Sequence, residues 1–279
     1  MLGRALVDVL KAEGAFSMNL TRAELDITDR VTVAKVLTLH RPRWVINAAA
    51  YTNVDQAERE EALATDVNGF AVGELAARCA ELGTRLLHVS TDYVFSGDGN
   101  RPYREDDPTE PLGAYGRGKR VGESLVLAAS PEHLVVRTAW LYGPGGRNFA
   151  RTILEAALQR PELTVVDDQH GCPTFTPDLA KALVGLLHLG AQGVVHAVAS
   201  GETTWHGFAS RLIRTAGLKT PVRPCATDQF PRPAPRPAYS VLDTSLLTEY
   251  LGAPMRPWEA GADDYVTFLK AEGVLPGAG

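Results

Sequence analysis

The stretch Leu86-Leu87-His88-Val89-Ser90-Thr91-Asp92 has the pattern of a buried strand that ends in polar residues. The stretch Tyr115-Gly116-Arg117-Gly118-Lys119 follows it and opens a segment that is helical in pattern as far as Ala129. Catalytic groups in open α/β sheets gather at the carboxyl ends of strands. The order strand, polar residues, helix therefore predicts an α/β sheet with a catalytic site beside Thr91.

Tyr115 and Lys119 are the first candidates for chemistry. Residues four apart lie on one face of a helix, so the ammonium can sit close to the phenol. A free phenol has a pKa of about 10, and a neighbouring positive charge lowers that pKa towards the range where general acid catalysis works best. We expect Tyr115 to donate a proton and Thr91 to supply a second hydrogen bond to a substrate carbonyl. A surface Tyr beside a solvated Lys is the alternative, because one Tyr-x-x-x-Lys motif is a weak signal.

The composition excludes several classes of protein. The 279 residues are 45% hydrophobic with a net charge of −5, which excludes extended disorder and argues against a nucleic-acid binder with a basic face. Three widely spaced Cys indicate reduced cytoplasmic thiols and no zinc knuckle, and no two of the seven His have metal-ligand spacing. No signal peptide or membrane-spanning apolar run is visible. We therefore expect no metal site, no membrane and no nucleic-acid partner.

Strands and helices alternate through the first half of the chain. Asp29 is expected to cap the second helix, and the long helix at 58–82 to bury Ala62, Val67, Phe70 and Leu75. Such alternation predicts a parallel sheet covered by helices on both faces. We expect strands at 15–20, 44–46, 85–89 and 133–137, and helices at 1–10, 29–40, 58–82 and 115–129.

The second half is less regular. The segment 167–174 is too polar for a core, and 221–237 is rich in proline, so both are expected to be surface loops. We expect helices at 148–160, 177–189, 204–217, 241–251 and 258–272, and strands at 163–166 and 194–198.

Six motifs, taken in order, resemble those of the dTDP-4-dehydrorhamnose reductase family, which belongs to the extended short-chain dehydrogenase/reductases. The combination is specific and covers nearly the whole chain. The motifs are Asn47-Ala48-Ala49-Ala50-Tyr51-Thr52-x-Val54-Asp55-x-Ala57-Glu58, Ser90-Thr91-Asp92-Tyr93-Val94-Phe95, Tyr115-Gly116-x-x-Lys119, Arg137-Thr138-Ala139-Trp140-Leu141-Tyr142, Asp168-Gln169-x-Gly171-x-Pro173-Thr174 and Arg236-Pro237-x-x-Ser240. The resemblance implies a Rossmann-like doubly wound parallel sheet with a smaller, discontinuous C-terminal substrate domain. The sheet domain would comprise residues 1–138 and about 175–198, and the substrate domain residues 139–174 and 199–279.

The resemblance also implies a reaction. Hydride from a nicotinamide would reduce the C4 ketone of dTDP-4-dehydro-β-L-rhamnose to dTDP-L-rhamnose, while the protein supplies orientation and a proton. Arg22 stands where an acidic residue would bind the ribose of NAD, and an arginine can accommodate the 2′-phosphate of NADP. NADPH is therefore expected, with NADH as the alternative. The implied protein is cytoplasmic, a monomer or homodimer, and bound to a dTDP-sugar; the nucleotide base and any divalent cation stay open.

Site residues are carried over from the family one at a time. Tyr115 would protonate the C4 alkoxide, Lys119 would lower the pKa of Tyr115 and bind the nicotinamide ribose, and Thr91 would bond the reacting oxygen. Alternatives for Gln169 and Arg236 are a loop hydrogen bond and a surface charge. The implied substrate-binding residues are Thr91, Asp92, Trp140, Gln169, Thr174 and Arg236, and the implied cofactor-binding residues are Leu2, Arg22, Asp26, Ile27, Ala49, Ala50, Tyr51, Tyr115 and Lys119.

The sequence departs from the family pattern at its start. The family begins with a strand and a Gly-x-x-Gly-x-x-Gly turn that brings the backbone against the cofactor diphosphate. Here only Met1-Leu2-Gly3 is present, with Gly3 at the last glycine. We expect the first strand to be missing, the chain as written to bind dinucleotide weakly, and a version extended by roughly a dozen residues to be active. In the alternative, a neighbouring chain or a rearranged segment fills the gap.

Two other functions stay open. One is an extended reductase or epimerase with a different nucleotide sugar, because one fold supports many substrates. The other is a non-catalytic regulatory subunit of the same fold. The lack of the glycine turn favours the subunit, whereas the presence of Thr91, Tyr115 and Lys119 argues against it.

Overall fold

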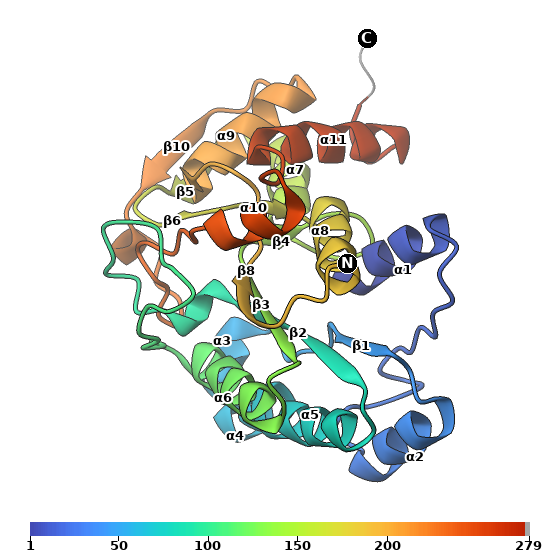
Figure 1. Ribbon diagram of the computed structural model, residues 1–279. Helices are drawn as coiled ribbons and strands as arrows, with labels where there is room; N and C mark the ends of the chain where they lie inside the picture. Colours follow the sequence, from blue (N-terminus) through green and yellow to red (C-terminus); the bar gives the residue numbers. More distant parts are fainter. Residues whose placement is uncertain (277–279) are drawn as a thin grey trace.

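Four parallel strands form the central sheet of the computed structural model, which describes residues 1–276 (Figure 1). They are β1 (Trp44–Asn47), β2 (Arg85–Thr91), β3 (Leu134–Thr138) and β8 (Gly193–His196), in the order β1-β2-β3-β8. In this register Asn47 lies beside His88, and Thr91 beside Thr138. Because all four strands run the same way, their carboxyl ends share one edge of the sheet.

Helices cover both faces of this sheet, as predicted (Figure 1). Leu87 and Val136 join the core on one face, whereas Leu86 and Val135 join the core on the other. Adjacent strand residues point to opposite faces, so an apolar run without alternation is typical of a sheet that is buried on both sides. The first face is covered by α1 (Leu2–Ala12) and α8 (Thr176–His188), and the second by α2 (Arg30–His40), α5 (Ala71–Glu81) and α6 (Ala114–Ala129).

A second hydrophobic core, which includes Tyr142, Phe208 and Tyr265, unites most of the remaining elements. Figure 1 shows these elements at the end of the molecule opposite α2, α5 and α6. They are α7 (Phe149–Gln159), α9 (Trp205–Ala216) and α11 (Trp258–Ala271), with the strand pairs β5 (Leu163–Val166) and β10 (Val222–Cys225), β4 (Leu141–Tyr142) and β7 (Thr174–Phe175), and β6 (His170–Gly171) and β9 (Thr203–Thr204). The short elements are α3 (Val54–Ala57), α4 (Glu61–Thr65), η1 (Asp66–Phe70), η2 (Asp92–Val94), η3 (Thr227–Gln229) and α10 (Ser245–Leu251).

The predicted strand at 15–20 does not form. No described strand pairs with this segment, and β1, the edge strand of the described sheet, pairs only with β2. The apolar side chains of the segment are consequently exposed, to 97% for Phe16, 45% for Met18 and 43% for Leu20. An apolar segment becomes a strand only where a neighbour satisfies its backbone hydrogen bonds.

The predicted helix at 58–82 is three elements, because η1 is a turn of π-helix between α4 and α5. The wider turn changes which side chains face inward: Ala62 and Phe70 are exposed, whereas Asn68 is buried. Asn68 then holds the chain after β1, since its Oδ1 accepts from the Tyr51 N–H at 2.8 Å and its Nδ2 donates to the Tyr51 carbonyl oxygen at 3.0 Å. Such π turns are frequent at functional sites.

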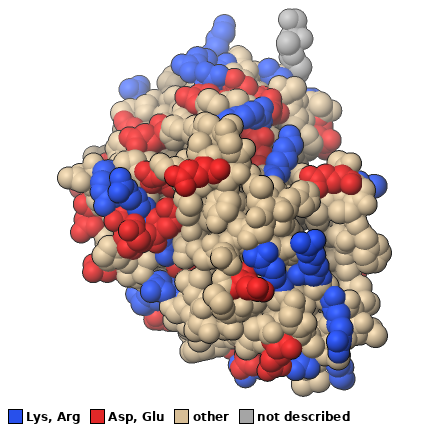
Figure 2. Space-filling view, viewed as in Figure 1, with Lys and Arg blue, Asp and Glu red and all other residues tan. Residues whose placement is uncertain are grey.

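Three further features bear on possible partners: membrane-spanning helices, metal sites and surface charge. Within residues 1–276, no helix has the length and apolar character to cross a membrane. The same residues contain no group of three or more His, Cys, Asp or Glu side chains arranged to hold a metal ion. Figure 2 shows basic and acidic side chains interspersed on the face in view.

Candidate active site

Buried polar side chains gather at the carboxyl ends of β2 and β3. Three of their atoms, Ser90 Oγ, Asp92 Oδ2 and Thr138 Oγ1, have no hydrogen-bond partner among the described residues. Buried polar atoms without partners are rare, and a ligand that supplies the missing bonds is one explanation. This edge of the sheet is therefore the candidate active site.

Tyr115 reaches this edge from the first turn of α6. The neighbouring residue must be glycine, because a Cβ at Gly116 would lie 2.2 Å from the Tyr93 carbonyl oxygen. The rings of Tyr93 and Tyr115 meet edge to face, with centroids 5.7 Å apart. Thr91 lies close enough to the Tyr115 phenol to lower its pKa, and Tyr115 keeps part of its surface exposed, so a substrate can approach it. The structure thus brings Tyr115 and Thr91 together, as predicted.

The predicted effect of Lys119 on Tyr115 is wrong for this structure. Burial, together with the Asp92 carboxylate, raises the pKa of Tyr115 to about 12, and only the hydrogen bond with Thr91 opposes this. Lys119 directs its Nζ away, to the Val89 carbonyl oxygen at 2.6 Å and to His88 Nε2 at 3.0 Å. Tyr115 is therefore protonated at neutral pH, which is the form a proton donor needs.

Thr91 and Asp92 form a second polar pair at the end of β2. The Thr91 hydroxyl donates to Asp92 Oδ1 at 3.0 Å and accepts from the Tyr93 N–H at 3.2 Å. Burial raises the pKa of Asp92 to about 6, while the hydrogen bond from Thr91 opposes this shift. The unpartnered Asp92 Oδ2 leaves this pair able to bind a hydroxyl group of a ligand.

Two predicted cofactor residues, Ala49 and Ala50, lie in the turn that leaves β1. Ala49 is exposed and Ala50 is partly exposed, so a ligand can reach their backbone. The next residue, Tyr51, donates its hydroxyl to Glu60 Oε2 at 2.6 Å. Small side chains at the carboxyl end of a strand, with the buried amine of Lys119 reaching from α6 to Val89 of β2, fit a dinucleotide at this edge.

The remaining predicted cofactor residues lie apart from Tyr115 in the chain and in their contacts. Arg22, whose side chain is 84% exposed, forms an ion pair with Asp26 at 3.1 Å. Ile27 packs against the core beneath α2. The side chain of Leu2 is buried in the core between α1 and α8, which contradicts a side-chain contact with a cofactor and leaves only its backbone for that role.

Trp140 and Gln169 form a cluster with Trp205, a residue that the sequence analysis did not single out. The Trp140 ring stacks on Trp205, with centroids 3.5 Å apart and an interplanar angle of 5°. Trp205 Nε1 donates to Gln169 Oε1 at 3.1 Å, and Gln169 Nε2 donates to Thr227 Oγ1 at 2.9 Å. Trp140 has φ of 48°, a left-handed conformation that costs energy in a residue other than glycine and is typical of functional sites.

Thr174 and Arg236 differ in how far they support their predicted substrate contacts. Thr174 is fully buried, and its hydroxyl donates to the Cys172 carbonyl oxygen at 3.0 Å. Its predicted substrate contact stays a prediction. Arg236 donates to Asp55 Oδ1 at 3.0 Å, and its charge acts on the Tyr93 phenol, which places it near the site.

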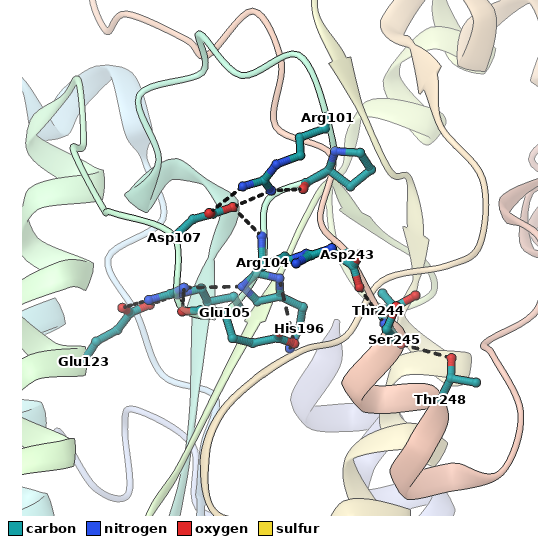
Figure 3. Close-up of polar contacts among 12 residues, drawn as sticks. Arg101, Arg104, Glu105, Asp107, Glu123, His196, Asp243, Thr244, Ser245 and Thr248 are labelled. Atoms are coloured by element: carbon teal, nitrogen blue, oxygen red, sulfur yellow. Dashed lines mark hydrogen bonds and ion pairs between the residues drawn. The ribbon is translucent and has the colours of Figure 1, made fainter.

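Glu123, labelled in Figure 3, forms a buried ion pair with Arg137 of β3, which sequence reasoning missed. Arg137 binds both oxygens of Glu123 at 2.9 Å and donates to the Glu105 carbonyl oxygen at 3.1 Å. It also lies 3.3 Å from His196 Nε2. A charged residue inside an apolar strand was the only signal in the sequence, and its partner could not be read from it.

Comparisons with known proteins agree with this geometry. The family model described as RmlD substrate binding domain matches residues 1–270. The dTDP-4-dehydrorhamnose reductase of Streptomyces griseus is 46% identical over 267 residues, which cover 93% of this chain and 88% of that protein. The dTDP-4-keto-6-deoxy-D-glucose reductase of Streptomyces niveus is 42% identical over 274 residues, which cover 98% of this chain and 95% of that protein.

Solved structures give the same result. A dTDP-4-dehydrorhamnose reductase from Clostridium acetobutylicum superposes with a TM-score of 0.93 at 37% identity, covering 96% of each chain. One from Bacillus anthracis, in complex with NADP, has a TM-score of 0.92 at 35% identity and covers 96% of this chain and 95% of that one. The expected family is confirmed: this chain belongs to the RmlD substrate-binding family, whose matched relatives include the dTDP-4-dehydrorhamnose reductases.

Proposed function

We propose that this chain is an NADPH-dependent oxidoreductase that reduces the C4 ketone of dTDP-4-dehydro-β-L-rhamnose, the last step of dTDP-rhamnose biosynthesis. The proposal rests on the meeting of Tyr115, Thr91 and Asp92 at the end of β2, in a chain that is 46% identical to a reductase of that name. The relative from Bacillus anthracis holds NADP, which supports NADPH as the cofactor. We place the enzyme in the cytoplasm, as a monomer or homodimer of two-domain chains.

The nicotinamide, when bound, supplies the hydride. In the proposed mechanism Tyr115 gives its phenolic proton to the C4 oxygen as negative charge develops there. Asp92 holds the Thr91 hydroxyl in place before the substrate binds, through their 3.0 Å contact. Thr91 would then turn its single hydroxyl proton from Asp92 Oδ1 to the C4 oxygen, which stabilises the charge there. Lys119 lies one turn from Tyr115 and would hold the cofactor ribose.

A second candidate substrate is dTDP-4-keto-6-deoxy-D-glucose, which has a ketone at the same carbon. The observation that favours it is the 42% identity to the Streptomyces niveus reductase over 98% of this chain. The proton donor and the hydride donor would be the same for both substrates. The choice between them therefore depends on the pocket around Trp140 and not on the chemistry.

Loss of the nicotinamide absorbance band with each sugar decides between these functions. We expect NADPH to be consumed with each sugar when that sugar is tested alone. The value of kcat/KM should be at least tenfold higher for dTDP-4-dehydro-β-L-rhamnose. Equal or reversed values would make the second candidate the function. If NADPH is consumed with neither sugar, the function as a non-catalytic subunit is favoured.

A further inference from the structure

A line of hydrogen bonds runs from the backbone after β1 to Lys119. The Ala49 N–H donates to Asn47 Oδ1 at 3.1 Å. Asn47 Nδ2 lies 3.1 Å from His88 Nδ1, and His88 Nε2 lies 3.0 Å from Lys119 Nζ. Lys119 Nζ donates to the Val89 carbonyl oxygen at 2.6 Å. Asn47, His88 and Lys119 are 4%, 0% and 1% exposed, so bulk water does not enter the line.

The direction of this line is fixed at the Ala49 end. A backbone N–H can only donate, so Asn47 must turn its oxygen to Ala49 and its nitrogen to His88. The reversed amide would set the Asn47 amide nitrogen against the Ala49 N–H, two donors with no acceptor between them. Because an amide nitrogen also only donates, His88 Nδ1 must accept, and the neutral ring then carries its proton on Nε2.

The same count of hydrogen-bond donors and acceptors decides the protonation state of Lys119 at the other end of the line. His88 Nε2–H points at Lys119 Nζ, and a donor needs a lone pair opposite it. An ammonium has no lone pair, whereas an uncharged amine has one and still donates to Val89. We propose that His88, held in its Nε2–H form by Asn47, is a positioning residue that keeps Lys119 an uncharged amine until the cofactor binds, and that Lys119 then takes up a proton from solvent.

The surroundings of Lys119 agree with this form. Burial lowers the pKa of Lys119 to about 7, and burial also lowers the pKa of His88. Glu123, one turn further along α6, acts in the opposite direction, but both of its oxygens are bound by Arg137 (Figure 3). The anionic phosphates of a bound dinucleotide would favour the charged amine, and this step alone rests on the proposed function.

The elements that pack on α6 carry other titratable groups. The charged or titratable groups on these elements are Tyr115, Arg117, Arg120 and Glu123 on α6, Arg85 and His88 on β2, Asp92 and Tyr93 on η2, Arg137 on β3, Asp55 on α3, Glu61 on α4, Asp66 on η1, and Glu74, Arg78, Cys79 and Glu81 on α5. Of these groups, Glu123 raises the pKa of Lys119, and His88 contacts its Nζ.

The first test is the tautomer of His88, measured by ¹⁵N–¹H correlation of the imidazole nitrogens without cofactor. We expect the proton on Nε2. His133 is an internal standard for that form, because its Nδ1 accepts from the Leu86 N–H at 3.2 Å and its Nε2 lies 3.0 Å from the Ala76 carbonyl oxygen. The His88 signal is assigned by its loss in His88→Gln. A proton on Nδ1, which would make Lys119 the donor, would overturn the proposal.

Asn47→Asp tests the cause, because a carboxylate can only accept. We expect this near-isosteric change to move a proton to His88 Nδ1, so that Nε2 accepts from a Lys119 ammonium. An unchanged Nε2–H tautomer in a variant with wild-type near-UV circular dichroism would show that Asn47 does not set the direction, and the proposal would be wrong.

The second test is proton uptake on NADPH binding, from calorimetry at pH 8 in two buffers that differ in ionisation enthalpy. We expect the wild type to take up about one proton, Asn47→Asp almost none, and His133→Gln, a matched buried-histidine control, the wild-type amount. Wild-type binding without uptake would overturn the proposal. If NADPH does not bind at all, the proposed function fails, and the tautomer result still decides the form of Lys119.

Discussion

Tyr115 is a partly buried phenol that keeps its proton, and its role can be tested by a single substitution. Tyr115→Phe removes the hydroxyl and keeps the ring against Tyr93. We expect kcat to fall by about two orders of magnitude or more, because general acid catalysis contributes about 10² to 10⁴. The Kd for NADPH, measured by fluorescence titration, should change less than twofold. A Tyr115→Phe variant with wild-type kcat would contradict the assignment.

Asp92 makes stability depend on pH. Its carboxyl has a pKa of about 6 in the folded chain because of burial, against about 4 when unfolded, so the folded chain holds the extra proton between these values. The free energy of unfolding should therefore fall as pH rises from about 4 to about 6, by up to about 3 kcal/mol. Asp92→Asn should remove this loss and exceed the wild type in urea unfolding at pH 8, with equal stability at pH 4. A less stable variant at pH 8 would exclude this effect.

Arg22 bears on the choice of cofactor. Its side chain is exposed and engaged only with Asp26 among the described residues, so it is free to bind a phosphate. We expect Arg22→Ala to raise the KM for NADPH about tenfold, the loss of one charge-assisted contact, and to leave the KM for NADH unchanged. Arg30→Ala, another exposed arginine in an ion pair, is the control. A wild-type KM that is lower for NADH than for NADPH would refute the preference.

At the residue scale, sequence reasoning succeeded where a side chain acts through its own helix or strand end. Tyr115 and Thr91 meet because each follows from the order of elements. The reasoning failed where a partner comes from elsewhere in the chain: the contact of His88 with Lys119 was not predicted, and the direction of the Tyr115 pKa shift was reversed. Burial in the folded chain and contacts between neighbouring strands decide these properties. Neither can be read from the sequence.

Among the elements, η1 and α6 pack so closely that glycine is required. A Cβ at Gly122 would lie 2.3 Å from the Asn68 carbonyl oxygen. We expect Gly122→Ala to lower the free energy of unfolding by about 1 to 3 kcal/mol, as overpacking does. Gly3→Ala is the matched control, because nothing lies within 4 Å of its Cβ and alanine favours a helix. Urea unfolding of both variants measures the difference, and equal stabilities would show that η1 can yield.

The elements themselves were largely predictable, with informative exceptions. Periodicity and caps located the helices, and Asp29 caps α2 by accepting from the Thr32 N–H at 3.0 Å as expected. The prediction of a strand at 15–20 was wrong because strand formation depends on a partner. The π turn of η1 was not predicted because a single extra residue in a turn leaves no signal in the composition.

Across the whole molecule, the site joins two cores. Thr91 and Tyr115 belong to the sheet and its helices, whereas Trp140 stacks on Trp205, which packs against the second core. We propose the division into a sheet domain and a substrate domain on this basis. We expect the two cores to hold the sugar between them at the end of β2, so that substrate choice and chemistry depend on different parts of the chain.

The central claim is that hydride passes to C4 and a proton from Tyr115 to its oxygen. The most direct measurement is a turnover with NADPH deuterated at the transferred position, followed by NMR of the sugar product. We predict dTDP-L-rhamnose with deuterium at C4, formed at a rate that falls in Tyr115→Phe. Product with deuterium at another carbon, or recovered sugar whose stereochemistry changes without net oxidation of NADPH, would contradict the account.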